Sequence, residues 1–172
     1  MLSHPGTAGS MERSLDRFFS HFILRLDAKG RISVPASFRA VLAQEGGDAL
    51  FCYPALDRPA VEAGGRALMA EIEDLIGRFP PFSDEREQFA TALYGTSETL
   101  KIDAEGRVTL SEQLKDHAGI MDAAAFVGLG HKFQIWAPDR FSARLSEATG
   151  KMRALRKRLG AERAADPQGA RE

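Results

Sequence analysis

Two short segments of this chain each place an aspartate, a glycine and an arginine at the same positions within five residues. They read Asp27-Ala-Lys-Gly-Arg31 and Asp103-Ala-Glu-Gly-Arg107. Asp and Gly are typical of a tight turn, because the carboxylate accepts backbone N–H bonds and Gly takes a positive φ. An arginine that pairs with the aspartate across the turn is pre-oriented, and its planar fork suits phosphates and guanine edges. These residues therefore predict anion binding.

Further charged residues accompany both segments and make them unequal. Arg25 and Lys29 lie beside Arg31, whereas the second segment keeps Lys101 but has Glu105 where the first has Lys29. Turns with flanking charges are common in β proteins, so one copy alone would favour a purely structural reading. With a second copy present, an anion-binding role and a purely structural role are equally well supported. We expect the first segment to carry most of the anion contact and the second to contribute chiefly to fold and assembly.

Residues that could support other chemistry do not form a recognisable site. Cys52 stands in the apolar run 50–53, which is typical of a buried structural thiol. Gly128-Leu-Gly130 is too short for a phosphate-binding loop and lacks the Lys and Ser/Thr that follow one. No metal-ligand spacing relates Cys52 to the histidines, which are His4, His21, His117 and His131. We predict no metal, no cofactor and no enzymatic activity.

The two segments belong to a longer internal repeat. Residues 22–35 align with residues 98–111 at a constant offset of 76, with matching apolar residues on both sides of the turn. The second half of each repeat is looser: residues 50–54 resemble residues 133–138 after the offset grows. Each repeat is predicted to form a hairpin, a short helix, and then a second hairpin or strand pair.

The elements around the first turn follow from periodicity. Leu24 and Leu26 alternate with Arg25, which is the two-residue period of a half-buried strand. Pro35 ends the strand after the turn and suits the first turn of a helix, which carries an apolar stripe from Phe38. Ser111 replaces this proline in the second copy and is predicted to cap the helix there.

Three more helices are predicted outside the repeats. One spans Pro59 to Phe79, with Leu68, Ile72, Leu75 and Ile76 on one face. Another follows the cap residue Ser83. The third spans Asp139 to Leu159 and becomes increasingly basic. Residues 1–17 and 162–172 are expected to be mobile.

Composition and charge bound the class of protein. With 172 residues, 44% hydrophobic and 27% charged, the chain fits an ordinary globular protein, and no apolar run approaches the length of a membrane span. Acidic residues before residue 17 argue against a signal peptide, so we expect a cytoplasmic protein. The net charge of −1 hides segregation: residues 45–90 hold ten Asp/Glu against four Arg, and residues 151–163 hold six Lys/Arg against one Glu. A basic face is therefore compatible with the neutral total.

A family resemblance rests on these motifs. Residues 26–35, followed by Phe38-Arg39, resemble the swapped-hairpin AbrB-type DNA-binding motif. The whole arrangement resembles the MraZ family of bacterial transcriptional regulators over about residues 18–146. The match includes Tyr53-Pro54, Leu93-Tyr94-Gly95 and the closing segment from Phe133 to Phe141.

The resemblance implies a fold and a division of the chain. The fold class is α+β and mostly β, with tandem pseudo-symmetric half-barrel modules of the double-split β-barrel type and with intervening and C-terminal helices. The expected parts are a mobile N-terminal extension at 1–17, a first module at 18–68, a helical connector at 69–96, a second module at 97–146, and a basic C-terminal helix and tail at 147–172.

The resemblance also implies a function. Such proteins are sequence-specific repressors that bind double-stranded DNA at direct repeats in the promoter of their own cell-division and cell-wall gene cluster. They assemble into ring-shaped homo-oligomers. As a DNA-binding protein of this kind, the chain is expected in the cytoplasm, on the nucleoid. Arg31 and Arg107 would be the chief contacts and the two aspartates would position them. The full DNA-binding set is Arg25, Asp27, Lys29, Arg31, Lys101, Asp103 and Arg107.

Two alternatives stay open. The same fold could serve as a protein-interaction or scaffold module that does not bind DNA. The basic segment after Gly150 could add phosphate contacts, or it could be a solvated helix end.

Overall fold

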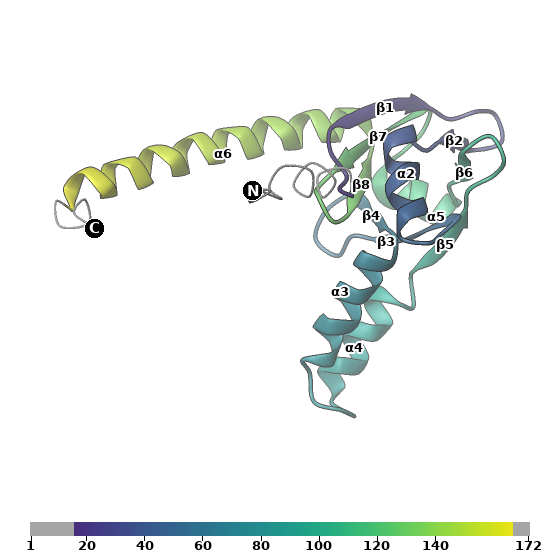
Figure 1. Cartoon of the computed structure of the whole chain (residues 1–172), viewed down its shortest axis with the longest axis horizontal. Coiled ribbons are helices and arrows are strands. Elements are labelled where there is room, and N and C mark those ends of the chain that lie inside the picture. The colour runs from purple at the N-terminus through teal and green to yellow at the C-terminus, as the bar shows by residue number, and fades with distance from the viewer. Residues whose placement is uncertain (1–15, 167–172) are drawn as a thin grey trace, which may run out of the picture. The chain divides into compact units, whose positions relative to one another are not determined.

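The computed structural model describes residues 16–166, which contain eight strands and five helices (Figure 1). The strands are β1 (His21–Arg25), β2 (Arg31–Ser33), β3 (Ala49–Pro54), β4 (Ala60–Gly64), β5 (Glu98–Lys101), β6 (Arg107–Thr109), β7 (Ala123–Gly128) and β8 (Phe133–Trp136). The helices are α2 (Ala36–Gln44), α3 (Arg66–Gly77), α4 (Asp84–Leu93), α5 (Glu112–Ala118) and α6 (Pro138–Ala165). The predicted α+β class with a majority of strands among the regular elements is confirmed.

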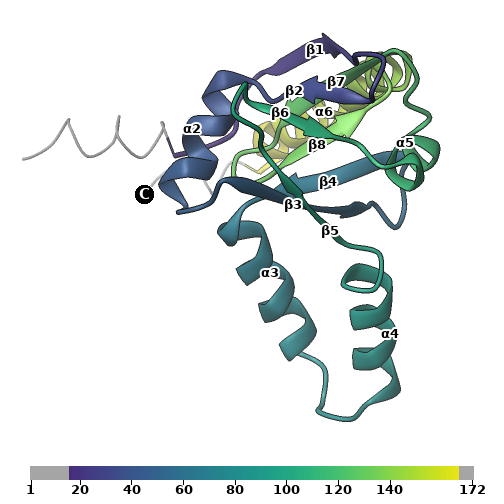
Figure 2. The same ribbon diagram turned by 90° about the vertical axis from the view of Figure 1, so that its right-hand side faces the viewer.

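The strands form two antiparallel sheets in which the two repeats are interleaved (Figure 2). Six strands run in the order β1-β7-β8-β4-β3-β5, and β2 pairs with β6 in a separate two-stranded ribbon. β1 pairs with β7, from His21 opposite Val127 to Arg25 opposite Ala123. β3 likewise pairs with β5, with Ala49 opposite Lys101. Each repeat thus supplies strands whose ladder partners lie in the other.

An aromatic cluster holds α2 against the larger sheet. Phe38 of α2 is fully buried, and its ring centroid lies 5.0 Å from that of Phe133 on β8. Phe18 packs against Phe133 at 4.9 Å, and Phe126 on β7 joins the same cluster. Aromatic pairs at such distances each add about 0.5–1.5 kcal/mol beyond the burial of their area. The cluster fixes the position of α2 beside the β2–β6 ribbon.

The short helices after the ribbon strands begin as the sequence predicts. Pro35 precedes α2, whose buried face carries Phe38. The Ser111 hydroxyl accepts a hydrogen bond from the Leu114 amide at 3.3 Å, so the predicted cap of α5 is confirmed. Gly119 takes φ +66° and ends α5 in the left-handed region. Both helices therefore start directly after β2 and β6 and stay close to the ribbon.

The predicted helix from Pro59 begins only at Arg66, and the first part of that prediction is wrong. Residues Ala60–Gly64 form β4, all five of them buried between β3 and β8. A short apolar run has the same composition in a buried strand as in a helix, so periodicity does not distinguish them. The remainder is helical as far as Gly77. Leu68, Ile72 and Ile76 are buried as predicted, whereas Leu75, predicted for the same face, is 38% exposed.

α3 and α4 form a helical hairpin that extends from the sheet on the side away from the ribbon (Figure 2). The Ser83 hydroxyl accepts from the Arg86 amide, which confirms Ser83 as the cap of α4. The rings of Phe79 and Phe89 stack at 4.9 Å and join the two helices near the tip. This hairpin carries much of the acidic charge of the chain's middle region.

The chain divides into two compact units at residue 138, and α6 forms the second (Figure 1). The helix begins at Pro138 and continues to Ala165, beyond the predicted end at Leu159. The predicted mobile segment 162–172 is therefore helical as far as Ala165, and its last residues lie outside the described range. The predicted extension 1–17 also lies outside it, apart from Asp16 and Arg17. Of the helices between residues 16 and 166, none is long and apolar enough to cross a bilayer.

Candidate nucleic-acid interface

The first turn is organised around the Asp27 carboxylate. Its Oδ1 accepts hydrogen bonds from the Lys29 and Arg31 amides, both at 2.9 Å. Its Oδ2 accepts from Arg31 Nε at 2.6 Å. The Gly30 amide donates to the Asp27 carbonyl, and Gly30 takes φ +77°, a conformation that side chains disfavour. The aspartate therefore fixes both the turn and the direction of the Arg31 side chain, as the sequence predicts.

The second turn repeats this geometry. Asp103 Oδ1 accepts from the Glu105 and Arg107 amides at 3.0 and 2.9 Å, and Oδ2 accepts from Arg107 Nε at 3.0 Å. Gly106 takes φ +79°. One contact has no counterpart in the first turn: Arg107 Nη2 donates to Glu105 Oε2 at 3.1 Å. The terminal nitrogens of Arg31 have no such partner within residues 16–166.

The β2–β6 ribbon brings the two turns together. Arg31 lies opposite Thr109, Ser33 lies opposite Arg107, and the central pair of Ile32 and Val108 is buried. The ladder continues into the turns themselves. The Val34 amide donates to the Gly106 carbonyl at 2.9 Å.

The same exchange occurs in the opposite direction. The Leu110 amide donates to the Gly30 carbonyl at 3.2 Å. Each turn is therefore bonded to the strand that follows the other turn. The two arginines are presented by one rigid two-stranded element.

Two basic residues that the site prediction omitted lie against the turns, each beside the turn of the other repeat. Arg39 of α2 donates through Nε to the Val34 carbonyl at 3.1 Å, and a Cβ built on Gly106 would lie 2.8 Å from its guanidinium carbon. Lys115 of α5 approaches the first turn, with Nζ 3.6 Å from a Cβ built on Gly30. The alignment of Phe38-Arg39 with Leu114-Lys115 is the signal that could have found them.

Hydrogen bonds within each turn stabilise the charged form of its aspartate, and in the second turn also that of the arginine. The backbone hydrogen bond from Arg31 is the main cause that lowers the pKa of Asp27, and the one from Arg107 does the same for Asp103. The pKa of Arg107 is raised first by its hydrogen bond to Asp103, and also by the Glu105 and Asp27 carboxylates. Both carboxylates are ionised at neutral pH and hold their arginines in place.

The remaining predicted residues flank the turns. Arg25 ends β1 opposite Ala123, and Lys101 ends β5 opposite Ala49, both with exposed side chains. Lys29 is exposed within the first turn. The structure thus places all seven predicted residues on the two turns and on the strand ends that enter them. The five cations among them lie close to Arg39 and to Lys115, which pairs with Glu112, so positive charge gathers around the ribbon.

The side chains of Cys52, His117 and His131 lie away from the two turns and make structural contacts. Cys52 is buried, as predicted, and burial raises the pKa of its thiol to about 12. His131 pairs with Glu71 at 2.6 Å, and His117 Nε2 lies 3.1 Å from the Arg58 carbonyl. No group of three potential metal ligands occurs in the described part of the chain.

Comparison with known proteins gives consistent matches. Residues 93–160 match the family model described as "MraZ protein, putative antitoxin-like". The chain is 60% identical to the "Transcriptional regulator MraZ" of Azorhizobium caulinodans over 146 residues, which are 85% of this chain and 93% of that protein. It is 58% identical to the protein of that name from Xanthobacter autotrophicus, over 90% of this chain and 98% of the relative. The protein of the same name from Rickettsia canadensis is 40% identical over 76% of this chain and 88% of its own length. The relatives are named for a regulatory role, which is not an enzymatic one.

Proposed function

The chain belongs to the MraZ family of transcriptional regulators, and we propose that it is a sequence-specific DNA-binding repressor. Its operator is a set of direct repeats in the promoter of its own cell-division and cell-wall gene cluster. It acts in the cytoplasm on the nucleoid. The modules at 18–68 and 97–146 form the DNA-binding body, and residues 69–96 connect them.

The observation that carries this proposal is the pair of aspartate-held arginines on one ribbon. Asp27 holds Arg31 at 2.6 Å and Asp103 holds Arg107 at 3.0 Å. A two-stranded ribbon fits the major groove, where an arginine fork can read guanine O6 and N7. The flanking cations, Arg25, Lys29 and Lys101, bind phosphates and set the register of the ribbon on the duplex.

Assembly supplies the affinity that a single ribbon lacks. Two arginine contacts and a few phosphate contacts are small compared with typical specific interfaces. Several copies on one DNA molecule raise the avidity, because the second copy binds at a high effective concentration. Direct repeats present their sites in one orientation, which suits copies arranged head to tail. We therefore propose a ring-shaped homo-oligomer as the DNA-binding form.

A mobility-shift titration with the DNA upstream of the gene tests the proposal. We expect Arg31→Ala to weaken specific binding by about 10- to 100-fold, since a bidentate arginine–guanine pair contributes about 1–3 kcal/mol. Arg107→Ala should weaken it less, because Arg107 also donates to Glu105. Arg78→Ala is the matched control, because it removes the same charge from the exposed end of α3. If all three variants shift the DNA at the same protein concentration as wild type, the assignment of Arg31 and Arg107 to the DNA contact is wrong. A protein that binds no upstream fragment specifically would be a scaffold module instead.

A further inference from the structure

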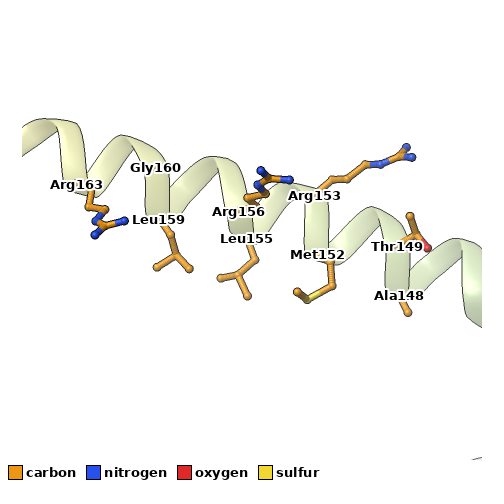
Figure 3. Close-up of a pocket in the computed structure, with 9 residues that line it drawn as sticks. All are labelled: Ala148, Thr149, Met152, Arg153, Leu155, Arg156, Leu159, Gly160 and Arg163. Atoms are coloured by element: carbon orange, nitrogen blue, oxygen red, sulfur yellow. The ribbon is translucent and has the colours of Figure 1, made fainter. Parts of the chain in front are cut away.

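α6 carries an exposed apolar stripe that its own unit does not cover (Figure 3). Leu145, Met152 and Leu159 are 46%, 62% and 51% exposed and recur every seven residues. Ala148 and Leu155 stand between them at the alternate spacing of three and four. In Figure 3 the Met152, Leu155 and Leu159 side chains point the same way, and Arg153 points elsewhere. This narrow seam is typical of a helix that packs against another helix or a groove, whereas membrane-surface helices carry a broader apolar face.

The residues beside the seam are basic on both sides. Arg144, Lys151 and Arg158 follow one flank, and Arg156 and Arg163 follow the other. If two copies of α6 paired with each other, these flanks would face like charges in either orientation. Arg156 and Arg163 form no ion pair within residues 16–166, so their charge is not balanced there. A surface that complements this seam is therefore apolar and acidic.

A groove lined by apolar side chains and three carboxylates lies in the first unit, between the sheet and the α3–α4 hairpin. Its volume is about 470 Å³. Leu56, Leu75 and Phe89 contribute apolar surface, and Leu56 is 61% exposed. Asp57 and Glu71 stand at its rim with side chains 74% and 54% exposed, and they pair with Arg58 and His131. Arg58 and Lys132 line the groove as well, so its carboxylates exceed its cations by one.

The overall charges of the two elements are complementary. Residues 138–165 hold eight Lys/Arg against three Asp/Glu, whereas residues 66–93 hold six Asp/Glu against three Arg. Opposite potentials on two surfaces steer their association and exclude pairing of each surface with itself. The apolar seam supplies the burial that stabilises such a contact once it forms.

We infer that α6 of one copy docks, through the Leu145–Leu159 seam and its flanking arginines, in the α3–α4 groove of a second copy. The contact joins two different surfaces, so each copy offers one helix and one groove, and a chain of such contacts grows until it closes. This inference rests on the proposed self-assembly and names the surfaces that produce it. The DNA-binding ribbon takes no part in the contact.

Charge reversal in the full-length chain tests the inference, with molar mass measured by light scattering and sedimentation velocity. Arg156→Glu with Arg163→Glu alters the seam flank, and Asp57→Lys with Glu71→Lys alters the groove rim. Arg140→Glu with Lys157→Glu is the matched control, because it makes the same charge change at exposed positions of α6 that do not line the seam. All six positions have exposed or partly exposed side chains, and circular dichroism confirms that each variant is folded.

We expect wild type and control to assemble alike, and each of the other two variants to need at least tenfold more protein to reach the same mass. Mixing the seam variant with the groove variant restores assembly into oligomers in which the two variants alternate. The reversed helix of the seam variant fits the reversed groove of the groove variant, and the unaltered helix of the groove variant fits the unaltered groove of the seam variant. A chain that combines all four substitutions regains assembly, since its reversed helix meets a reversed groove. Wild type that stays monomeric, a seam variant that assembles like the control, or a mixture that never exceeds monomer would overturn the inference.

The same variants separate other partners of the helix. A seam variant with unchanged mass but a flatter salt dependence of DNA binding would assign the helix to phosphate contacts and overturn the inference. Unchanged mass with lost binding to phosphatidylglycerol vesicles would assign it to a membrane surface and would overturn the inference as well. The proposed function is judged separately, because Arg31→Ala and Arg107→Ala are expected to weaken specific DNA binding while leaving the mass unchanged.

Discussion

Replacing Glu105 by lysine should turn the second turn into a stronger DNA contact. Glu105 Oε2 accepts from Arg107 Nη2 at 3.1 Å, so it occupies part of the fork that the first turn leaves open. The glutamate side chain is 68% exposed, and a surface pair of this kind contributes about 0–1 kcal/mol to folding. Glu105→Lys therefore frees Arg107 and adds a cation at the position of Lys29 with little loss of stability.

The magnitude follows from counterion release. Each additional phosphate contact steepens the plot of log K against log salt by about 0.9. At about 0.1 M salt one contact then strengthens binding about eightfold, which corresponds to about 1.2 kcal/mol. We expect one new contact from the lysine, and a second where the freed Arg107 also reaches a phosphate. Glu105→Gln, which only frees the arginine, should give the smaller share of the effect.

The assay is fluorescence anisotropy with labelled operator DNA at several salt concentrations. Lys29→Glu serves as the mirror experiment, since it gives the first turn the composition of the second. It should flatten the salt dependence and weaken binding. If Glu105→Lys changes neither the slope nor the affinity while Lys29→Glu weakens binding, the second turn does not face DNA and the predicted contact is refuted.

Three further predictions concern the turns and the core. Gly106→Ala and Gly130→Ala should each lower the free energy of unfolding in urea by about 1–2 kcal/mol, because both glycines have a positive φ. The Arg39 guanidinium beside Gly106 is the end of a flexible side chain and can move aside, so a much larger loss at Gly106 would contradict this reasoning. The pKa values of Asp27 and Asp103 are lower in the folded protein than in the unfolded chain. Their stabilising contribution is therefore present above about pH 4 and is lost as the pH falls through the folded-state pKa. Carboxyl NMR titrations with midpoints at or above about 4 would refute this. Cys52, with a pKa of about 12, should react with a thiol reagent at pH 8 only after unfolding, and rapid labelling of the native protein would show that its burial is incomplete.

The sequence predicts the two turns almost completely, because their geometry is local. Asp, Gly and Arg within five residues specify the backbone hydrogen bonds, the positive φ and the ion pair without help from distant residues. The start of α5 at its Ser111 cap is local for the same reason. Because the turns are local, the sequence also places the seven predicted site residues on the turns or beside them.

The pairing of strands is not local, and here prediction stops. β1 and β2 flank one turn and look like the arms of a hairpin, yet β1 pairs with β7 and β2 pairs with β6. Nothing in the alternation of Leu24 and Leu26 indicates which distant strand completes the ladder. The crossed positions of Arg39 and Lys115 depend on that pairing, which is why the site prediction omitted them.

The pairing of His21 with Val127 has a consequence for synthesis on the ribosome. β1 is made early, but its ladder partner emerges only after most of the chain has been translated. Until then the N-terminal half exposes an unpaired strand edge, and such edges favour aggregation in nascent chains. Contacts between residues so distant in sequence also slow folding. β1 therefore completes its ladder only after β7 has left the exit tunnel.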